Sequence, residues 1–282
     1  MDLLRFPVQI LIVSLMVHAV CRDSGTEASV QQPIAPQAGG KPRPLPGPSH
    51  DCSWEEIEYK PGSFPSRGRT IQVDQFQPKQ SGRYPVIIMI HGSGGLITHT
   101  GTEMPAKENF GEIQIACAGY VSLLVHYFDS TGILSTGDVE LMQRQSPDWL
   151  ATLSQAVDYA SSLPKADPRR IGLLGESLGG YLALSLAMTD QRIRAVSEYG
   201  GGIRLREGDN PKKLPPILIQ HGGVDSIVPV SEAEGLAKLL SHIGVQYEIH
   251  IYEGLEHYLN TKARAEALAY SIQFFNNHLK AR

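Results

Sequence analysis

Apolar residues recur along this chain in short continuous runs that alternate with longer stretches of helical periodicity. Continuous apolar runs are typical of strands buried on both faces, and here they occupy residues 84–90, 121–125, 171–174, 193–199, 217–220 and 247–252. Helical patterns occupy residues 108–118, 146–163, 178–188, 231–243 and 261–279. Strands that alternate with helices predict an α/β fold, in which helices cover both faces of a mostly parallel sheet.

Two shorter stretches ahead of these runs alternate apolar and polar residues and predict two further strands, 55–59 and 70–76. Gly62 and Pro65 lie between them and suit a turn. In parallel sheets, ligands bind beyond the carboxyl ends of the strands. Candidate chemistry is therefore sought directly after each buried run.

The run at 171–174 is followed by Gly175-Glu-Ser-Leu-Gly179, a G-x-S-x-G motif with a predicted strand before it and a predicted helix after it. This context places Ser177 on a tight strand-to-helix turn as a candidate nucleophile. The N–H of Leu178 then points toward a developing oxyanion. The alternative is a structural glycine-rich turn, and Glu176 is interpreted as a residue that supports the turn.

The run at 84–90 ends in a second glycine-rich segment, His-Gly-Ser-Gly-Gly at 91–95. Such a turn exposes backbone N–H groups that can complete an oxyanion hole. We predict that the second donor is the Ser93 N–H, with Gly94 as the alternative. A simple flexible turn is the other interpretation, and His91 is expected to shape the turn by hydrogen bonding.

Asp225 follows the run at 217–220 and is the candidate acid, because in this fold type the acid follows the nucleophile and precedes the histidine. An Asp that only stabilises its own turn is the alternative, and Asp209 lies in a polar loop that suits the role less well. Four histidines follow Asp225. His257 alone lies in a loop after the last predicted strand, whereas the other three fall inside predicted helices or strands: His242, His250 and His278. His257 is therefore the candidate base.

With these segments in place, the chain resembles the dienelactone hydrolase family of the α/β-hydrolase superfamily from about Val86 to His278. The matching segments are His91-Gly92, Gly175-Glu-Ser-Leu-Gly179, Gly222-Gly-Val-Asp225 with Val228-Pro229, and Glu253-Gly-Leu-Glu-His257. The resemblance implies an α/β-hydrolase sheet of about eight strands whose second strand is antiparallel, and it assigns the same triad.

The family's name-giving enzyme has a Cys at the position of Ser177, which puts a lactone substrate in doubt. Variants with Ser are similar to carboxylesterases and to the catalytic domains of peptidases that cleave short peptides.

The segment 127–149 is longer than the usual strand-to-helix loop of about 2–6 residues, and long loops are often functional. Its apolar residues could line a substrate pocket. We predict that Phe128 and Met142 contact the substrate. The alternative is a short helix that packs these residues into the core, in which case residues 99–107 or 204–213 build the pocket.

The N-terminus predicts export. Residues 6–17 are mostly apolar and Val17-His-Ala19 has the spacing of a signal-peptidase site, so residues 1–19 are interpreted as a signal peptide of a secreted or periplasmic protein. The apolar stretch is shorter than the roughly 20 residues that span a bilayer. An uncleaved anchor and a lipoprotein anchor at Cys21 are the alternatives.

Residues 20–50 are interpreted as a linker, because six prolines lie between residues 31 and 50 and apolar periodicity is absent. Residues 51–282 form the predicted α/β-hydrolase domain.

The chain has three cysteines. In an oxidising compartment Cys21 and Cys52 could pair, whereas Cys117, on the apolar side of a predicted helix, is expected to be a buried free thiol.

A formal net charge of −4 and a sequence pI near 6.2 argue against a nucleic-acid-binding protein. The chain has no HExxH and no paired CxxC motif, so no metal or other cofactor is expected.

Only residues 200–215 separate two predicted strands near the site, which is too short for a large lid domain. The sequence therefore predicts a serine hydrolase that cleaves esters of small or medium size through an acyl-enzyme. A peptidase or acyltransferase on the same triad and, more remotely, a non-catalytic binding module are the alternatives, and the sequence does not indicate an oligomeric state.

Overall fold

The computed structural model describes residues 54–96 and 111–280. The predicted signal peptide at 1–19, the linker at 20–50, Cys21, Cys52 and the segment 99–107 all lie outside the described residues. Among the described residues, no helix combines the length and the apolar character needed to cross a membrane.

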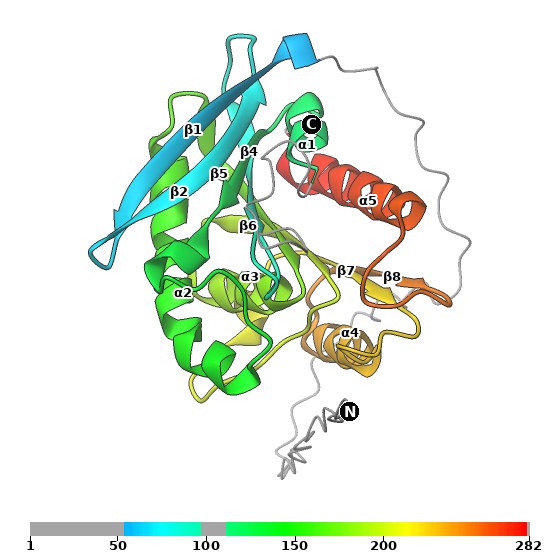
Figure 1. Cartoon of the computed structure of the whole chain (residues 1–282). Coiled ribbons are helices and arrows are strands. Elements are labelled where there is room, and N and C mark those ends of the chain that lie inside the picture. Colours follow the sequence, from blue (N-terminus) through cyan, green and yellow to red (C-terminus); the bar gives the residue numbers. More distant parts are fainter. Residues whose placement is uncertain (1–53, 97–110, 281–282) are drawn as a thin grey trace, which may run out of the picture. The chain divides into compact units, whose positions relative to one another are not determined.

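The described residues form one eight-stranded sheet in the order β1-β2-β4-β3-β5-β6-β7-β8 (Figure 1). Strand β2 is antiparallel to both of its neighbours, and the pairs from β4 to β8 are parallel. This arrangement confirms the predicted α/β-hydrolase fold, including the antiparallel second strand. The strands are β1 Ile57–Ser66, β2 Arg69–Pro78, β3 Tyr84–Ile90, β4 Val121–Val125, β5 Ala166–Glu176, β6 Ile193–Tyr199, β7 Ile217–Gly222 and β8 Tyr247–Tyr252.

Helices cover both faces of the sheet (Figure 1). On one face the core contains side chains of α2, α3 and α4, and on the other it contains side chains of α1 and α5. Strands β3 and β4 are almost wholly buried between these layers, which explains their continuous apolar sequence. The helices are α1 Glu112–Cys117, α2 Val139–Ser162, α3 Leu178–Thr189, α4 Ser231–Ile243 and α5 Thr261–Leu279, with short 3₁₀ helices η1 Trp54–Glu56, η2 Tyr127–Ser130 and η3 Pro211–Lys213.

The first two strands are longer than predicted, and the predicted turn at Gly62 and Pro65 is wrong. Both residues lie inside β1, and the chain turns at Arg67 and Gly68, which have φ of 51° and 77°. Strand β1 is at the edge of the sheet, where a proline without an N–H group is tolerated.

Helix α2 begins earlier than predicted, at Val139, and continues through Pro147. The carboxylate of Asp138 accepts hydrogen bonds from the N–H groups of Glu140 and Leu141, which caps the first turn. The predicted helix at 108–118 is observed only from Glu112 to Cys117, and residues 108–110 lie outside the described part. Between β6 and β7 the only helix is η3, so no large lid domain occurs in this described segment.

The expectation of a free thiol at Cys117 is wrong, because Cys117 is disulfide-bonded. The chain has only two other cysteines, Cys21 and Cys52. A disulfide within the chain that includes Cys117 therefore excludes the predicted bridge between these two. Disulfide formation in the protein also requires an oxidising compartment or oxidant.

We expect a peptide map of the unreduced protein to contain the Cys117 peptide linked to a peptide with Cys52 or Cys21. Reduction before digestion separates the two peptides. Alkylation of Cys117 in the unfolded, unreduced protein would contradict this prediction, and the same map identifies the one cysteine that stays unpaired.

Candidate active site

Ser177 lies at the turn between β5 and α3, in a backbone conformation with φ 54° and ψ −119°. This positive φ is rare for a residue with a side chain and indicates local strain. The flanking glycines explain how the turn is tolerated. A Cβ atom at Gly175 would collide with the carbonyl of Gly179, and one at Gly179 would collide with the carbonyl of Ile90. Only glycine at both positions lets β3, β5 and α3 approach so closely.

Ser177, His257 and Asp225 form one hydrogen-bonded chain. Nε2 of His257 lies 3.0 Å from Oγ of Ser177, and Nδ1 of His257 lies 2.6 Å from Oδ2 of Asp225. The other carboxylate oxygen of Asp225 accepts hydrogen bonds from the N–H groups of Ile227 and Val228, at 2.9 and 2.8 Å. Asp225 and His257 are buried. The carboxylate is thus held in place from both sides, with one oxygen directed at the imidazole.

These three side chains come from the carboxyl ends of β5, β7 and β8. The hydroxyl of Tyr199, the last residue of β6, donates to the carbonyl of His257 at 2.9 Å. Gly200 follows with φ 60°, and a Cβ atom there would lie 3.1 Å from Cε1 of His257. Gly200 therefore packs directly against the imidazole, where a larger side chain would crowd the ring. The sequence analysis missed this role, although the run of three glycines at 200–202 could have indicated it.

The predicted oxyanion loop lies directly against the nucleophile. A Cβ atom at Gly92 would lie 3.3 Å from Cβ of Ser177. The loop is held by a hydrogen bond from the Gly95 N–H to the Gly92 carbonyl, and the Ser93 carbonyl accepts from Thr136. The hydrogen bonds found within the described chain use neither the Ser93 N–H nor the Leu178 N–H. Both donors thus lie on turns that border Ser177.

His91 is buried and shapes this loop. Because a carbonyl only accepts, the Nδ1–H of His91 donates to the Gly92 carbonyl at 2.8 Å, and the ring stacks on Tyr127 at a centroid distance of 4.2 Å. Burial lowers the pKa of His91 to about 3. The ring is therefore neutral at ordinary pH and is a structural part of the turn.

The structure places Phe128 in the core, so the prediction that it contacts the substrate is corrected. Residues 127–130 form η2, and the Phe128 ring, only 4% exposed, packs against His91, Tyr127 and Trp149. Met142 lies in the first turns of α2 and is partly buried against the same core. The segment 127–149 is thus largely helical. Its aromatic residues Tyr127, Phe128 and Trp149 are buried in the core, whereas Leu134 and Val139 are exposed.

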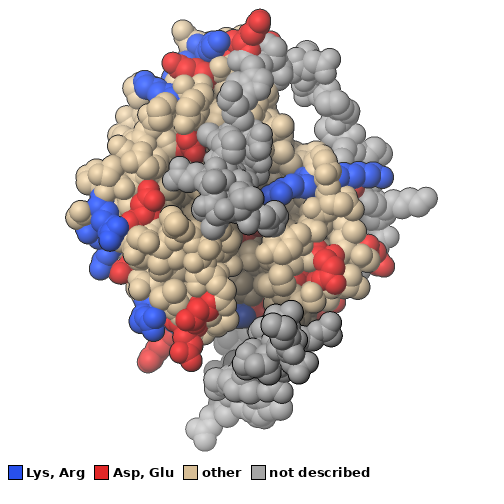
Figure 2. Space-filling view, in the orientation of Figure 1, with Lys and Arg blue, Asp and Glu red and all other residues tan. Residues whose placement is uncertain are grey.

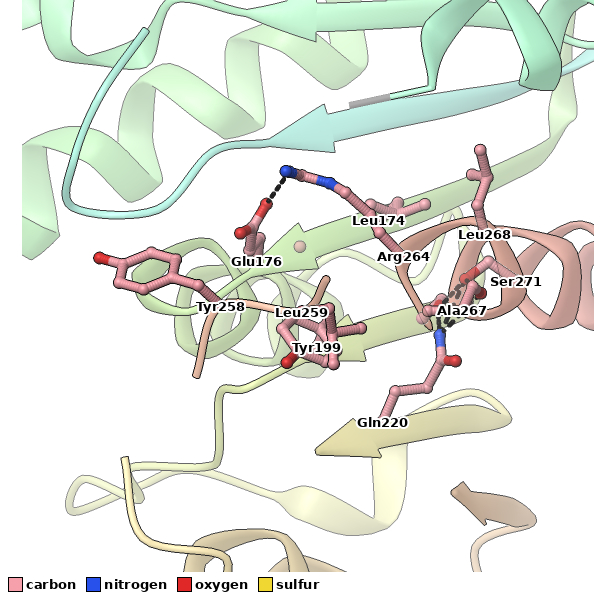
Figure 3. A pocket seen from close by; sticks show the side chains of 12 residues that line it. Leu174, Glu176, Tyr199, Gln220, Tyr258, Leu259, Arg264, Ala267, Leu268 and Ser271 are labelled. Carbon is pink, nitrogen blue, oxygen red and sulfur yellow. Dashed lines mark hydrogen bonds and ion pairs between the residues drawn. The ribbon is translucent and has the colours of Figure 1, made fainter. Parts of the chain in front are cut away.

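A hollow of about 590 Å³, counted with the solvent space at its mouth, lies beside the triad on the α5 face of the sheet (Figure 3). Glu176 and Tyr258, the neighbours in sequence of Ser177 and His257, line it. Arg264 of α5 reaches across toward Glu176, with 3.3 Å between Nη2 and Oε2. Burial raises the pKa of Glu176. The other lining residues are Leu174, Gly175, Ser197, Tyr199, Gln220, Leu259, Ala267, Leu268 and Ser271.

Comparison with known proteins identifies the family. The family model for the dienelactone hydrolase family matches residues 71–279. The chain belongs to the dienelactone hydrolase family. It is accordingly a hydrolase with a small-molecule substrate, and the resemblance noted from its motifs is confirmed.

Individual members and neighbours agree with this dienelactone hydrolase fold. A Synechocystis sp. protein with an assumed carboxymethylenebutenolidase activity is 28% identical over 241 residues, which cover 77% of this chain and 96% of that protein. A dienelactone hydrolase-like promiscuous phosphotriesterase, P91 from metagenomic libraries, has a TM-score of 0.67 at 18% identity and covers 80% of this chain and 100% of its own. The acylaminoacyl peptidase of Pyrococcus horikoshii has a TM-score of 0.63 at 18% identity, over 80% of this chain and 42% of its own.

Residues 54–96 and 111–280 of this dienelactone hydrolase family member contain no group of three or more His, Cys, Asp or Glu side chains that could hold a metal ion. On the face seen in Figure 2, Lys and Arg side chains lie in small groups beside Asp and Glu side chains, without an extended basic surface among the residues drawn in colour. The absence of a nucleic-acid partner stays a prediction from the net charge.

Glu198, at the end of β6, is a fully buried acid close to the nucleophile turn. Its Oε2 accepts a hydrogen bond from the Gly201 N–H at 2.9 Å, whereas Oε1 has no partner among the described residues. Burial raises the pKa of Glu198 from 4.5 to about 8. The native protein therefore keeps this proton between these two pH values, whereas the unfolded chain has lost it.

Since the native state binds the extra proton, the free energy of unfolding is expected to fall with rising pH up to about pH 8, by at most about 1.4 kcal/mol per pH unit. Glu198→Gln should flatten this decline. Chemical denaturation at several pH values between 6.5 and 8 measures it. His91 is neutral in the native state but partly protonated in the unfolded chain near pH 6.5, so it adds a slope of opposite sign that fades by about pH 7.5 and is the same in the wild type and the variant.

Glu234→Gln, on the exposed side of α4, is the matched control and should decline with pH like the wild type. Equal slopes for the Glu198→Gln protein and the wild type would show that Glu198 does not hold the proton.

Proposed function

We propose that this chain is a serine hydrolase that cleaves carboxylic esters of small or medium size through an acyl-enzyme. The observation that carries the proposal is the hydrogen-bonded chain Ser177–His257–Asp225, with distances of 3.0 and 2.6 Å, at the carboxyl edge of the sheet. A nucleophile, a base and an orienting carboxylate within hydrogen-bond reach are the requirements for acyl transfer.

In the proposed reaction, Oγ of Ser177 attacks the ester carbonyl carbon while its proton moves to Nε2 of His257. The N–H groups of Leu178 and Ser93 stabilise the oxyanion. The tetrahedral intermediate expels the alcohol, which takes the proton from His257. A water molecule, deprotonated by His257, then attacks the acyl carbon, and the acid is released as the proton returns to Ser177. Asp225 holds the imidazole with its Nδ1–H toward Oδ2 and stabilises the imidazolium.

Two experiments on the wild-type protein test this proposal. A fluorophosphonate should label Ser177 covalently, and peptide mapping locates the label. A panel of p-nitrophenyl esters, lactones and aminoacyl amides should show turnover of the esters. Absence of both labelling and turnover would favour the non-catalytic binding module, and faster turnover of the aminoacyl amides would favour the peptidase alternative.

We further propose that part of the substrate enters the hollow beside Glu176 and Tyr258, in place of the predicted contacts at Phe128 and Met142. The hollow borders the triad and its walls include Leu174, Leu259 and Leu268, which suit an apolar group.

Leu259→Trp, which narrows the hollow, is expected to lower the kcat/KM ratio of long to short acyl esters by about tenfold or more, because a pocket discriminates by how well it accommodates added methylene groups. Met142→Ala, on α2 outside the hollow, is the comparison. The ester panel run on both variants measures the ratio. If Met142→Ala changed the ranking of acyl chain lengths and Leu259→Trp left it unchanged, the segment 127–149 would form the substrate pocket, as the sequence predicted.

We propose that the protein is exported, as a secreted or periplasmic enzyme, on the basis of residues 1–19. The disulfide at Cys117 supports an oxidising destination. N-terminal sequencing of the mature protein should find a start directly after Ala19. A lipid on Cys21, visible as an added mass, would support the anchored alternative.

A further inference from the structure

A second histidine contacts the proposed triad acid. His221 lies near the end of β7 and its side chain is fully buried. Its Nε2 lies 2.8 Å from the Val228 carbonyl and 3.4 Å from Oδ2 of Asp225. This is the same carboxylate oxygen that Nδ1 of His257 approaches at 2.6 Å. One oxygen of Asp225 thus faces two imidazole rings.

The protonation of the His221 ring is set by its contacts. The Val228 carbonyl can only accept a hydrogen bond, so Nε2 of His221 carries the proton. Nδ1 of His221 is buried without a partner in the described part of the chain. A proton placed there would leave a buried donor unsatisfied, which is costly. The Nε2–H of His221 therefore donates to the Val228 carbonyl. Nε2 also lies 3.4 Å from Oδ2 of Asp225, so the partial positive charge of this N–H faces the carboxylate without a hydrogen bond to it.

Other polar groups around the acid come from each element packed against it. From the turn after β7, the N–H groups of Ile227 and Val228 donate to Oδ1 of Asp225. From β6, the Tyr199 hydroxyl binds the His257 backbone, and Glu198 lies deeper in the same strand. From β5 and α5, the Glu176–Arg264 pair lies beside the imidazole. Among the polar side chains of residues 54–96 and 111–280, His221 and His257 are the two that approach Oδ2 itself.

We propose that His221 is a positioning residue for the ester hydrolysis proposed above, on which this inference rests. Its Nε2–H ties the turn 222–228 to β7 through Val228 and places a partial positive charge 3.4 Å from Oδ2 of Asp225. This N–H dipole offsets part of the carboxylate's negative charge. It thereby limits how strongly Asp225 stabilises the His257 imidazolium, and so helps to determine the pH at which the base becomes free to act.

Three variants separate this role from simple packing. His221→Leu fills similar space without a donor, and His221→Gln can place an amide N–H where Nε2 lies. His250→Leu is the matched control, because His250 is partly buried on β8 and stacks on Tyr270 at 4.1 Å, away from the triad. The measurement is kcat/KM for one p-nitrophenyl ester as a function of pH.

For His221→Leu we expect the acid limb of the profile to move to higher pH by about half a unit, because without the N–H dipole the Asp225 carboxylate stabilises the His257 imidazolium more strongly. We also expect the plateau to fall about tenfold, because the turn 222–228 loses its hydrogen bond to His221 and holds Asp225 less firmly in the position that orients His257. His221→Gln should return both quantities most of the way to wild type. His250→Leu should leave the acid limb where it is.

An acid limb of His221→Leu that coincides with wild type, or a His221→Gln protein as impaired as His221→Leu, would overturn the proposal. If His221→Leu does not fold, proton NMR of the wild type decides. The Nε2–H signal of His221 should shift with the same midpoint as the acid limb, and a signal that is constant over this range overturns the inference. Failure of the proposed function looks different, because the wild type itself would then neither turn over esters nor react with a fluorophosphonate.

Discussion

Replacement of Ser177 by Ala is expected to abolish nearly all ester hydrolysis, with kcat lowered by about 10³-fold or more. Ala cannot form the acyl-enzyme, and only the oxyanion donors and substrate binding are left to accelerate attack by water. The fold should be unaffected, since Ala and Ser have the same steric cost at the observed φ of 54°. Circular dichroism and thermal unfolding check the fold, and the ester panel measures the loss.

Ser185→Ala is the matched control for this experiment. Ser185 lies on the same helix, two turns after Ser177, and its hydroxyl donates to the Tyr181 carbonyl at 2.9 Å. This variant should keep wild-type turnover. A folded Ser177→Ala protein that retains more than a tenth of wild-type kcat would contradict the assignment of Ser177 as the nucleophile.

The sheet could be predicted from the sequence because its central strands are buried on both faces. A strand with helices on both sides has no polar face, so β3 and β4 appear as almost continuous apolar runs. The edge strand β1 was predicted less well. Many of its side chains are exposed, so its sequence lacks a regular alternation of apolar and polar residues. Its edge position also permits Pro61 and Pro65 within the strand.

The segment 127–149 shows where local reasoning fails. Pro147 disfavours a helix interior by propensity, and the helix was predicted to begin only at residue 146. In the structure, the Asp138 cap and the packing of Trp149 against η2 stabilise a helix that extends through the proline. Tertiary contacts outweigh the local cost, and Phe128 becomes part of the core as a result.

The positions of Ser177, Asp225 and His257 could be predicted because each follows a recognisable strand, and parallel strands end at one edge. The contacts between elements could not. Gly200 beside the imidazole and His221 beside the acid are revealed only by the packing of β6, β7 and the loop after β8. The hollow is assembled from four elements, β5, β6, β7 and α5, and from the loop after β8, and no sequence pattern in these segments predicts it.

Replacement of Asp225 by Asn is expected to lower kcat by about 10³–10⁴-fold while the protein stays folded. The two carboxylate oxygens have different partners. Oδ1 accepts from the N–H groups of Ile227 and Val228, so the amide oxygen of Asn would stay there. The amide nitrogen would then replace Oδ2 and donate to Nδ1 of His257. This forces the proton onto Nε2, which can no longer accept the proton of Ser177.

The opposite orientation of the Asn amide is disfavoured, because its NH₂ group would face the two backbone N–H groups, and buried donors without acceptors are costly. Asp209→Asn is the control: the Asp209 carboxylate accepts from the Arg206 N–H at 2.7 Å in the loop after β6, away from the triad. Single-turnover kinetics on both variants measure the acylation step. An Asp225→Asn protein that is folded and acylates within tenfold of the wild type would mean that Asp225 only stabilises its own turn, as Asp residues commonly do.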